Sequence, residues 1–359
     1  MPGEEERGAQ APDAALSRVV TMLDVAHKAG VSVSTVSHVI NETRFVRPQT
    51  RDAVLNAISE TGYVRNSVAR SLTTARSQSI GLVMTVVTNP YFAEVVQGID
   101  EEVARNGYTL LLGDSHDDPD RELQMVRDLH QQRVDGIILA ASGDARRALR
   151  YLQEQAIPAV LVDRMANPEF DQVGTENVES TALLVRHLAD LGHRRIALVA
   201  GLEGLTTTTE RLSGYRLGLR RSELRFDPHL VVNGASSAAP ARRAVAGLLA
   251  GARRPTALVV GNNYMTIGAM RALSEAGLAV PGDVAVVAFD DFEWADLFAP
   301  RLTTMAQPCR EMGSSAVRLL LSRLNDPAQA PRTLRLAANF VHRDSCGCTA
   351  GPSGAAGGR

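Results

Sequence analysis

The sequence is poor in the residues and segments that mark secreted and membrane proteins. Cysteine occurs only three times in 359 residues, and a small, odd number of thiols in a chain of this size is typical of a reducing compartment. No apolar run approaches the ~20 residues that a membrane-spanning helix needs. The N-terminal stretch MPGEEERGAQAPDAALSR carries acidic side chains where a signal peptide carries basic ones, and it lacks an apolar core. We therefore expect a cytoplasmic protein in which residues 1–19 form a disordered tail.

Motifs of common enzymes and cofactor sites are also missing. There is no P-loop, no G-x-S-x-G and no dinucleotide-binding motif, and GLEGL at 201–205 is only a weak glycine pair. We therefore expect no enzymatic activity and no cofactor. His342, Cys346 and Cys348 form an H-x3-C-x-C pattern. Because structural zinc sites normally have four protein ligands, we assign no metal and expect residues 346–359 to be a flexible tail.

Charge is distributed unevenly along the chain. Residues 20–77 carry seven lysines and arginines against four acidic residues, a surplus of three, so the remainder carries about −5 when the whole chain is −2. A basic leading segment on an acidic body is typical of a protein whose one end faces a polyanion. A surplus of three charges is also within ordinary surface variation, so charge alone does not decide the partner.

Residues 20–64 have the pattern of three helices and contain no strand-like run. The helical segments are MLDVAHKA, SVSTVSHVIN and RPQTRDAVLNAISETG. Gly30 and Gly62 follow the first and third segments and are natural helix ends. Residues 65–77, RNSVARSLTTARS, are short, polar and basic. We therefore expect a small all-α domain joined by a linker to the rest of the chain.

From residue 79 onward, apolar runs rich in Val, Ile and Leu alternate with longer segments of helical period. This alternation predicts an α/β fold in which helices cover both faces of parallel sheets. The number of strands is larger than one compact sheet of this type holds, and we therefore expect two lobes with a cleft between them. Ligands of such sheets bind next to the carboxyl ends of the strands. The expected strands are 79–87, 108–114, 134–142, 157–163, 194–201, 229–234, 255–262 and 284–291.

The second helical segment has two contrasting faces at about 100° per residue. An apolar stripe that can pack on the preceding helix consists of Val33, Val36, Val39 and Ile40. The opposite face carries Ser34, Thr35, Ser37 and His38. Short polar side chains allow a helix to approach the major groove of DNA closely, and His38 can reach a purine edge there. With the tight GVS turn and Ser32 as N-cap, we expect a helix-turn-helix; a merely solvated face is the alternative.

These residues carry a family resemblance. The stretch TMLDVAHKAGVSVSTVSHVINETRFV, with TRDAVLNAISETGYVRNSVARSL and SIGLV after it, resembles the lactose-repressor/galactose-repressor (LacI) family, and its TVSHVIN…TRFV part is most similar to purine repressors. The resemblance covers about residues 20–345. It implies a homodimer that binds pseudo-palindromic double-stranded operator DNA. It also implies that Ser34, Thr35, Ser37 and His38 read bases, with further DNA contacts from Arg44, Ala69, Arg70 and Leu72.

The resemblance also assigns the linker and the body. Ser67–Leu72 matches the family's hinge helix, which orders on DNA, and Leu72 matches a leucine that wedges into the minor groove. A leucine that packs on the outside of the core is the alternative. The body then resembles a periplasmic-binding-protein-like effector and dimerisation domain over residues 78–345. Its expected lobes are residues 78–176 with 308–335, and residues 177–307 with 336–345.

Eight residues near expected strand ends are candidates for effector binding: Tyr91, Phe92, Asp163, Thr207, Arg211, Asn262, Asp290 and Trp294. The resemblance implies that Asp163, Arg211, Asn262 and Asp290 hydrogen bond to a sugar or nucleobase. Carboxylate, guanidinium and amide groups together suit adjacent hydroxyls. Aromatic rings can stack on a ring or a sugar face. The alternative for each polar residue is that it caps a helix or joins the two lobes, and Asp290 and Arg211 could pair with each other. The alternative for Trp294 is a place in the core.

Two departures from the purine repressors concern specificity. Leu205 stands where their base-reading arginine lies, and Ser236 stands where their stacking phenylalanine lies. We therefore do not transfer purine binding to this cleft. We expect a ligand-responsive transcriptional regulator, in the manner of a repressor, with a small polar effector such as a sugar. The rival hypotheses are a solute-binding protein without a DNA role and an enzyme that uses the α/β body.

A first prediction concerns Leu72. Leu72→Ala should reduce the bend that the protein induces in its operator, because an apolar wedge unstacks and kinks a base step. Circularly permuted operator fragments in a gel-shift assay measure the bend. Leu16→Ala, in the expected N-terminal tail, should leave it unchanged. An undiminished bend in the Leu72 variant would exclude the wedge role.

Overall fold

The computed structural model describes residues 20–63, 76–85 and 88–348. The chain divides into two compact units, residues 1–75 and 76–359, which we describe separately. The hinge residues Ala69, Arg70 and Leu72 lie outside the described residues.

The first unit is a three-helix domain whose helix ends follow from local sequence. Its helices are α1 (Met22–Ala29), α2 (Val33–Asn41) and α3 (Pro48–Thr61). Thr21 and Asp24 form a reciprocal capping box at the start of α1. Gly30 and Gly62 end α1 and α3 with φ of 64° and 65°, a conformation that glycine adopts without steric cost. The sequence-predicted helix ends at these glycines are therefore confirmed.

The apolar side of α2 holds the first unit together. Its buried core consists of Val25, Ala26, Val36, Val39, Val54 and Ala57. Ile40 packs against this core and is partly buried, as its position on the stripe predicts. Val33, however, remains 39 % exposed, so the prediction that it packs inward is wrong. It is the first residue of α2 and stands at the edge of the stripe, beyond the reach of the other helices.

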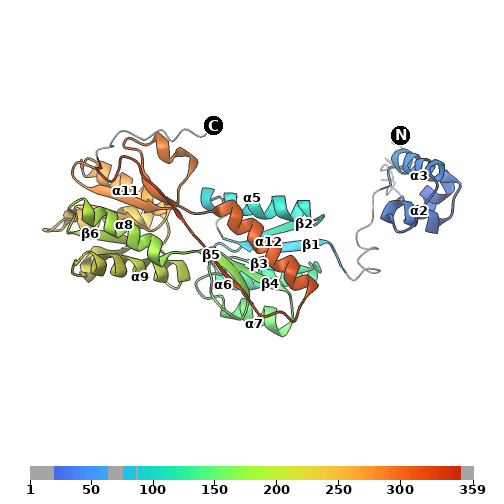
Figure 1. Ribbon diagram of the computed structural model, residues 1–359, viewed down its shortest axis with the longest axis horizontal. Helices are drawn as coiled ribbons and strands as arrows, with labels where there is room; N and C mark the ends of the chain where they lie inside the picture. The colour runs from blue at the N-terminus through green and yellow to red at the C-terminus, as the bar shows by residue number, and fades with distance from the viewer. Residues whose placement is uncertain (1–19, 64–75, 86–87, 349–359) are drawn as a thin grey trace, which may run out of the picture. The chain divides into compact units, whose positions relative to one another are not determined.

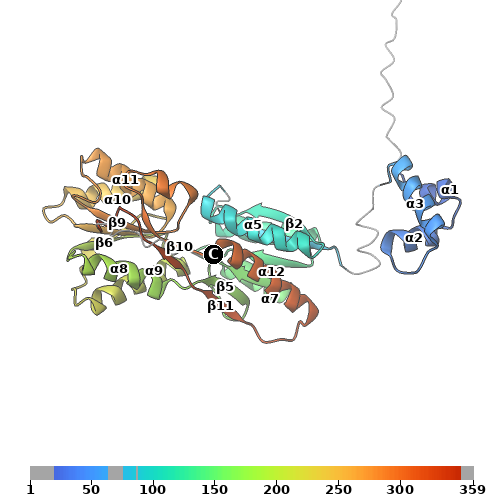
Figure 2. The same ribbon diagram turned by 45° about the horizontal axis from the view of Figure 1, so that its top comes forward.

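Within residues 76–85 and 88–348, the second unit forms two six-stranded sheets, one in each lobe (Figures 1 and 2). The first sheet has the order β11-β5-β4-β3-β1-β2 and is parallel throughout. Its strands are β1 (Ser79–Met84), β2 (Thr109–Asp114), β3 (Gly136–Leu139), β4 (Ala159–Val162), β5 (Asp171–Thr175) and β11 (Thr333–Leu336). The second sheet has the order β12-β10-β9-β8-β6-β7, and there β12 runs antiparallel to β10. Its strands are β6 (Ile196–Ala200), β7 (Val231–Asn233), β8 (Ala257–Val260), β9 (Ala285–Phe289), β10 (Thr303–Ala306) and β12 (Asn339–Val341).

Helices cover both faces of each sheet, which confirms the predicted α/β class. In the first lobe, one core lies under α5 and α12 and the other under α6 and α7; in the second, one lies under α8 and α9 and the other under α10 and α11. These helices are α5 (Pro90–Arg105), α6 (Pro119–Gln131), α7 (Arg146–Glu154), α8 (Val178–Asp190), α9 (Thr206–Arg221), α10 (Ala238–Ala250), α11 (Asn263–Glu275) and α12 (Cys309–Asn325). Two short 3-10 helices are η1 (Pro228–Leu230) and η2 (Glu293–Leu297). None of the helices in the described ranges is long and apolar enough to cross a membrane.

Each of the eight apolar runs contains a strand, but four strands were not predicted. β5, β10, β11 and β12 are three to five residues long. β5 reads DQVGT and gives no apolar signal although it is entirely buried. Arg323 donates to the buried Asp171 carboxylate, whereas Gln172 Oε1 and the Thr175 hydroxyl are buried without a hydrogen-bond partner among the described residues.

The chain passes between the lobes three times. The passages follow β5, β10 and β11 in the sequence. Figures 1 and 2 both show the red C-terminal strands running between the two lobes. The passages place the carboxyl ends of strands from both sheets next to one cleft.

The expected flexible tail is wrong for residues 346–348. Cys346 is fully buried in the core of the second lobe, and Cys348 packs against the same core. Ser345 fixes this segment, because its hydroxyl donates to the carbonyl of Val286 at 2.6 Å and accepts from the Thr303 amide at 2.8 Å.

The closest helix packing in the first lobe depends on two glycines. A Cβ placed on Gly313 of α12 would lie 2.3 Å from the carbonyl oxygen of Val95 in α5, and one on Gly98 would lie 2.4 Å from the carbonyl oxygen of Arg310. Because both obstacles are backbone atoms, no side-chain rotation can relieve the overlap.

We therefore predict that Gly313→Ala lowers the free energy of unfolding by about 1–3 kcal/mol, the usual cost of overpacking a core. Urea denaturation followed by circular dichroism measures it. Gly247 of α10 is a matched control, because it is exposed and a Cβ there meets no atom within 4 Å. Gly247→Ala should be neutral or stabilising through helix propensity. Equal stability of the two variants would contradict the packing argument.

Candidate nucleic-acid interface and ligand cleft

The polar face of α2 is organised by its N-cap. The Ser32 hydroxyl accepts a hydrogen bond from the Thr35 amide at 3.2 Å and lies 2.8 Å from the hydroxyls of Ser34 and Thr35. On the next turn, Asn41 donates to the Ser37 hydroxyl at 3.1 Å. The face is therefore a connected set of small hydrogen-bonding groups on one side of a helix whose other side is packed.

His38 is fixed in orientation at the middle of this face. Its Nδ1 lies 2.9 Å from the hydroxyl of Thr43, which follows the end of α2. A hydrogen bond at one ring nitrogen sets the direction in which the other points. Arg44 is exposed beside it, and Phe45 is 87 % exposed. The exposed aromatic at position 45 was not among the sequence candidates; its place directly after the recognition segment is the signal that could have found it.

The cleft of the second unit collects seven of the eight sequence-predicted effector residues. Leu205 and Ser236, the two departures from the purine repressors, line the same cleft. Six further polar residues that line it were not predicted: Asn89, Asp117, Arg164, Thr208, Tyr264 and Gln307. The predicted residues that line it are Tyr91, Phe92, Asp163, Thr207, Arg211, Asn262 and Asp290.

A chain of hydrogen bonds crosses the cleft from one lobe to the other. The Tyr91 hydroxyl donates to Asp163 Oδ1 at 2.6 Å and lies 3.4 Å from Gln307 Oε1. Gln307, on the passage between β10 and α12, donates through Nε2 to Asp290 Oδ1 at 2.6 Å. Burial, with the Asp163 carboxylate, raises the pKa of Tyr91 well above its usual value, so its hydroxyl stays a donor. Burial likewise raises the pKa of Asp290, and the charge of Arg211 opposes the rise.

The two central carboxylates occupy equivalent places in the two sheets. Asp163 directly follows β4 and Asp290 directly follows β9. Both have left-handed backbone conformations, with φ of 65° and 71°, which aspartate tolerates better than most residues. They are only 5 % and 3 % exposed. Strained, buried acids of this kind are typical of functional sites.

Arg211 lies against the cleft floor and does not pair with Asp290. Its guanidinium donates to Asn177 Oδ1 at 2.9 Å and to the carbonyl of Gly261, and it lies 3.9 Å over the Phe289 ring. In the part of the chain that the structure describes, no ion pair joins Arg211 to Asp290. The guanidinium is thus positioned by neutral partners, and its charge acts on Asp290 without a direct ion pair.

The two neighbouring asparagines have different roles. Asn262, expected to contact ligand, caps α11, because its Oδ1 accepts from the Met265 amide at 2.8 Å. Asn263, the first residue of α11, exchanges hydrogen bonds of 2.6 and 3.1 Å with Asn89 of the first lobe. The backbone amide of Asn263 also donates to Asp290 Oδ2 at 3.2 Å. Asn263 is therefore an interlobe contact.

Trp294 lies away from the cleft. Its ring packs 4.2 Å from the Phe292 ring and 5.7 Å from the Phe298 ring, on η2 and its flanks. The structure thus places it in an aromatic cluster, which was the alternative to a sugar platform.

Arg164 is the main cleft residue that sequence reasoning missed. It is buried, donates to the carbonyl of Ala141 at 2.9 Å and forms an ion pair with Asp117. Its guanidinium also lies 5.8 Å over the Phe92 ring. It directly follows Asp163 in the stretch VLVDR, so the strand end that identified the aspartate could have identified the arginine.

The family model described as bacterial regulatory proteins, lacI family, matches residues 21–66, and that of a periplasmic binding protein-like domain matches residues 185–346.

Similar proteins cover nearly the whole chain. An HTH-type transcriptional repressor PurR of Haemophilus influenzae is 36% identical over 307 residues, covering 85% of this chain and 91% of that protein. PurR of Aliivibrio fischeri is 35% identical, covering 91% and 98%. The lac repressor dimer bound to operator and the anti-inducer ONPF has a TM-score of 0.84 at 30% identity, covering 92% and 99%. A transcriptional regulator CelR–cellobiose complex has a TM-score of 0.70 at 30% identity, covering 91% and 99%.

Proposed function

The chain belongs to the lacI family of bacterial regulatory proteins, and we propose that it binds operator DNA through α2 and changes its operator affinity when a neutral, hydroxyl-rich effector occupies the cleft. It is a DNA-binding transcriptional regulator of the repressor type, because its relatives are repressors over nearly their full length. The rival hypothesis, a solute-binding protein without a DNA role, is disfavoured because residues 21–66 match the lacI family of regulatory proteins.

The polar face of α2 carries the DNA-binding half of the proposal. Ser34, Thr35 and Ser37 expose or half-expose hydroxyls on the side of α2 that does not pack. Because Thr43 holds Nδ1 of His38, the ring can offer Nε2 to a base edge in the major groove. Arg44 is exposed at the end of the face and suits a phosphate contact.

The charge of the cleft favours a neutral effector. Its lining contains three acidic side chains (Asp117, Asp163 and Asp290) and two basic ones (Arg164 and Arg211), a net charge of −1. Arg164 is paired with Asp117 and also lies 3.6 Å from Asp163 Oδ2, so the charges of the lining are largely balanced before a ligand binds. Hydroxyls donate to carboxylates and accept from a guanidinium in the same molecule. A sugar or polyol therefore fits better than an anionic metabolite.

Effector binding changes the affinity for operator DNA by changing the arrangement of the two lobes. An effector that bridges Asp163 and Asp290 competes with the hydrogen bonds of Gln307, which lies on a passage between the lobes. Ligand binding thus favours one lobe arrangement, and it shifts operator affinity only by its difference in affinity for the two arrangements.

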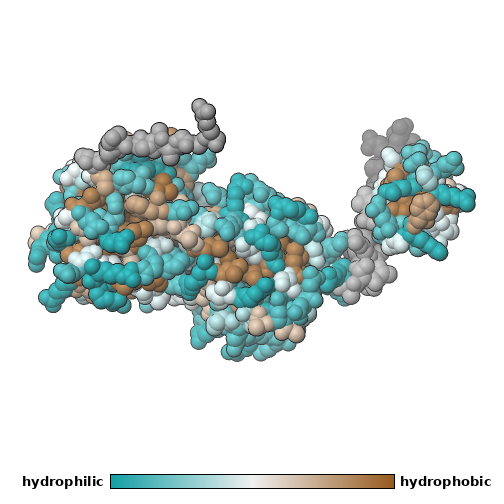
Figure 3. All heavy atoms as spheres, viewed as in Figure 1, coloured by the Kyte–Doolittle hydropathy of each residue, from teal (hydrophilic) through white to brown (hydrophobic). Residues whose placement is uncertain are grey.

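The same family supplies the assembly and the location. A homodimer matches the lac repressor dimer bound to operator. The edge strand β2 supports a subunit contact, because its Leu112 side chain is 48 % exposed. Figure 3 shows apolar side chains gathered over the region of α5 and α12 on a mostly hydrophilic face.

A regulator of chromosomal genes acts in the cytoplasm, and the relatives are repressors rather than enzymes.

We predict that His38→Ala weakens binding to the cognate operator by about 1–3 kcal/mol and relaxes sequence choice, because a base-edge hydrogen bond is lost. Selection of binding sites from a random duplex library, followed by titration at fixed salt, measures both effects. His27→Ala is the matched control, since His27 is exposed on α1. Unchanged sequence choice in the His38 variant would remove α2 as the reading helix. Failure of the wild-type protein to select any duplex would refute the proposed function.

We also predict that Arg211→Ala abolishes the response to effector. A thermal-shift screen of sugars, polyols and nucleosides should first find a neutral compound that raises the melting temperature of the wild-type protein, because a ligand stabilises the state it binds. Arg211→Ala should fold but lose this rise. Arg220→Ala, on the exposed side of the same helix α9, should keep it. A wild-type response in the Arg211 variant would exclude this residue from the ligand site.

A further inference from the structure

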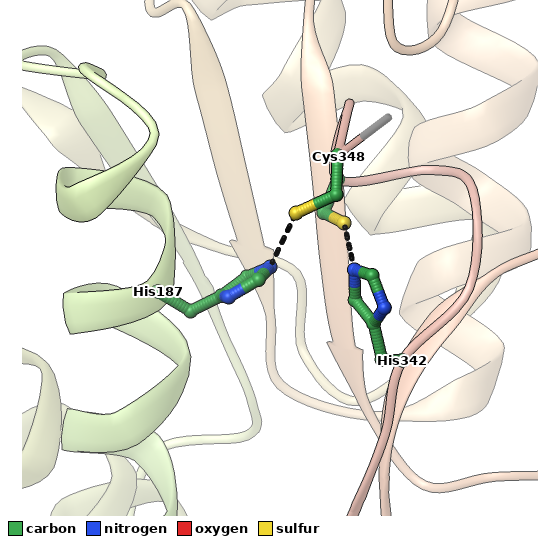
Figure 4. A group of neighbouring side chains, drawn as sticks. His187, His342 and Cys348 are labelled. Carbon is green, nitrogen blue, oxygen red and sulfur yellow. Dashed lines mark hydrogen bonds between the residues drawn. The ribbon is translucent and has the colours of Figure 1, made fainter. Parts of the chain in front are cut away.

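Four potential metal ligands converge at the C-terminal end of the second lobe. They are His187, His342, Cys346 and Cys348, and their ligand atoms all lie within 4.8 Å of one another. Figure 4 shows His187 reaching from its helix toward Cys348, with His342 approaching the same point from the other side. His187 belongs to the last turn of α8, so it is separated in sequence from the other three and completes the H-x3-C-x-C pattern only in the folded chain.

The spacing of the four atoms fits a tetrahedral ion. Zinc binds cysteine sulfur at about 2.3 Å and histidine nitrogen at about 2.0 Å, which gives a ligand tetrahedron with edges of about 3.3–3.8 Å. The two sulfur–nitrogen contacts match this range: Cys346 Sγ lies 3.3 Å from His342 Nε2, and Cys348 Sγ lies 3.7 Å from His187 Nε2. The remaining pairs need to contract by at most about 1.0–1.5 Å from the 4.8 Å limit.

The surrounding structure holds the four side chains in place. Gly347, between the two cysteines, has φ of 83° and forms a turn in which its amide donates to the carbonyl of Asp344. This left-handed turn keeps both thiols on one side despite the short C-x-C spacing, which glycine allows at least cost. The rings of His187, Phe340 and His342 pack at centroid distances of 4.9–6.1 Å. The two imidazoles are thereby oriented without any metal.

We propose that His187, His342, Cys346 and Cys348 form a structural zinc site that fastens the C-terminal segment to α8. Two thiolates and two imidazoles are the ligands of closed structural zinc sites. The bound ion joins the end of the chain to a helix that begins at the first passage between the lobes. It therefore stabilises the second lobe, because the four ligands come together only in the folded chain and the free energy of zinc binding adds to that of folding.

The test uses the full chain, expressed with zinc in the medium and purified under reducing conditions with any histidine tag removed. Elemental mass spectrometry should find about one zinc ion per chain. After zinc is stripped, cobalt(II) should give the absorption bands of a tetrahedral site together with a thiolate-to-cobalt charge-transfer band. Zinc should raise the melting temperature of the stripped protein. These wild-type measurements decide the matter even if a variant fails to fold.

Variants assign the ligands. His187→Ala and Cys348→Ser should lose the tetrahedral cobalt spectrum and the zinc-dependent rise in melting temperature. Cys309→Ala is the matched control, because Cys309 is a buried thiol in the core of the first lobe, and it should behave as wild type. Three results would overturn the proposal: no tetrahedral cobalt spectrum in the stripped wild-type protein, an unchanged spectrum in His187→Ala, or a Cys346–Cys348 disulfide in the reduced preparation.

Discussion

The body of this protein depends on one constraint: carboxylates buried where two lobes meet must be hydrogen bonded. Asp163 and Asp290 end strands in different sheets and are almost fully buried, and a buried charge without partners is costly. Tyr91 donates to Asp163 within the first lobe, Gln307 donates to Asp290 of the second, and the contact between Tyr91 and Gln307 joins the two. The lobe arrangement and the occupancy of the cleft are therefore coupled, since a ligand that bonds to these carboxylates competes with Tyr91 and Gln307 for their oxygens.

Helix α8 connects this cleft with the other end of the second lobe. At its start, Asn177 accepts a hydrogen bond from Arg211 in the cleft. In its last turn, His187 lies among the thiols and imidazole of the C-terminal segment. A metal ion there would fix one end of the helix whose other end positions the cleft arginine. Stability of the second lobe and geometry of the effector site would then share one rigid element.

The DNA-binding unit shows how far local patterns reach. The 3.6-residue period of α2 located both its packed residues, Val36 and Val39, and its polar face, because helical geometry is fixed by the backbone. The same period misplaced Val33, since the angular stripe says nothing of where the neighbouring helices end. In the body, glycine stops and apolar runs located most strands, whereas β5 was missed because it buries polar residues, of which Asp171 is matched by the distant Arg323.

The sequence by itself determined the class of the protein, the two-part organisation and seven of the nineteen residues that line the cleft, because strand ends, caps and the recognition helix are local features. It could not determine partners that lie far apart along the chain. Only the tertiary structure decided that Asn263 joins the lobes, that Trp294 belongs to an aromatic cluster and that Arg211 avoids Asp290. It alone brought His187 to Cys346 and Cys348, because contact between distant residues follows from packing and not from spacing.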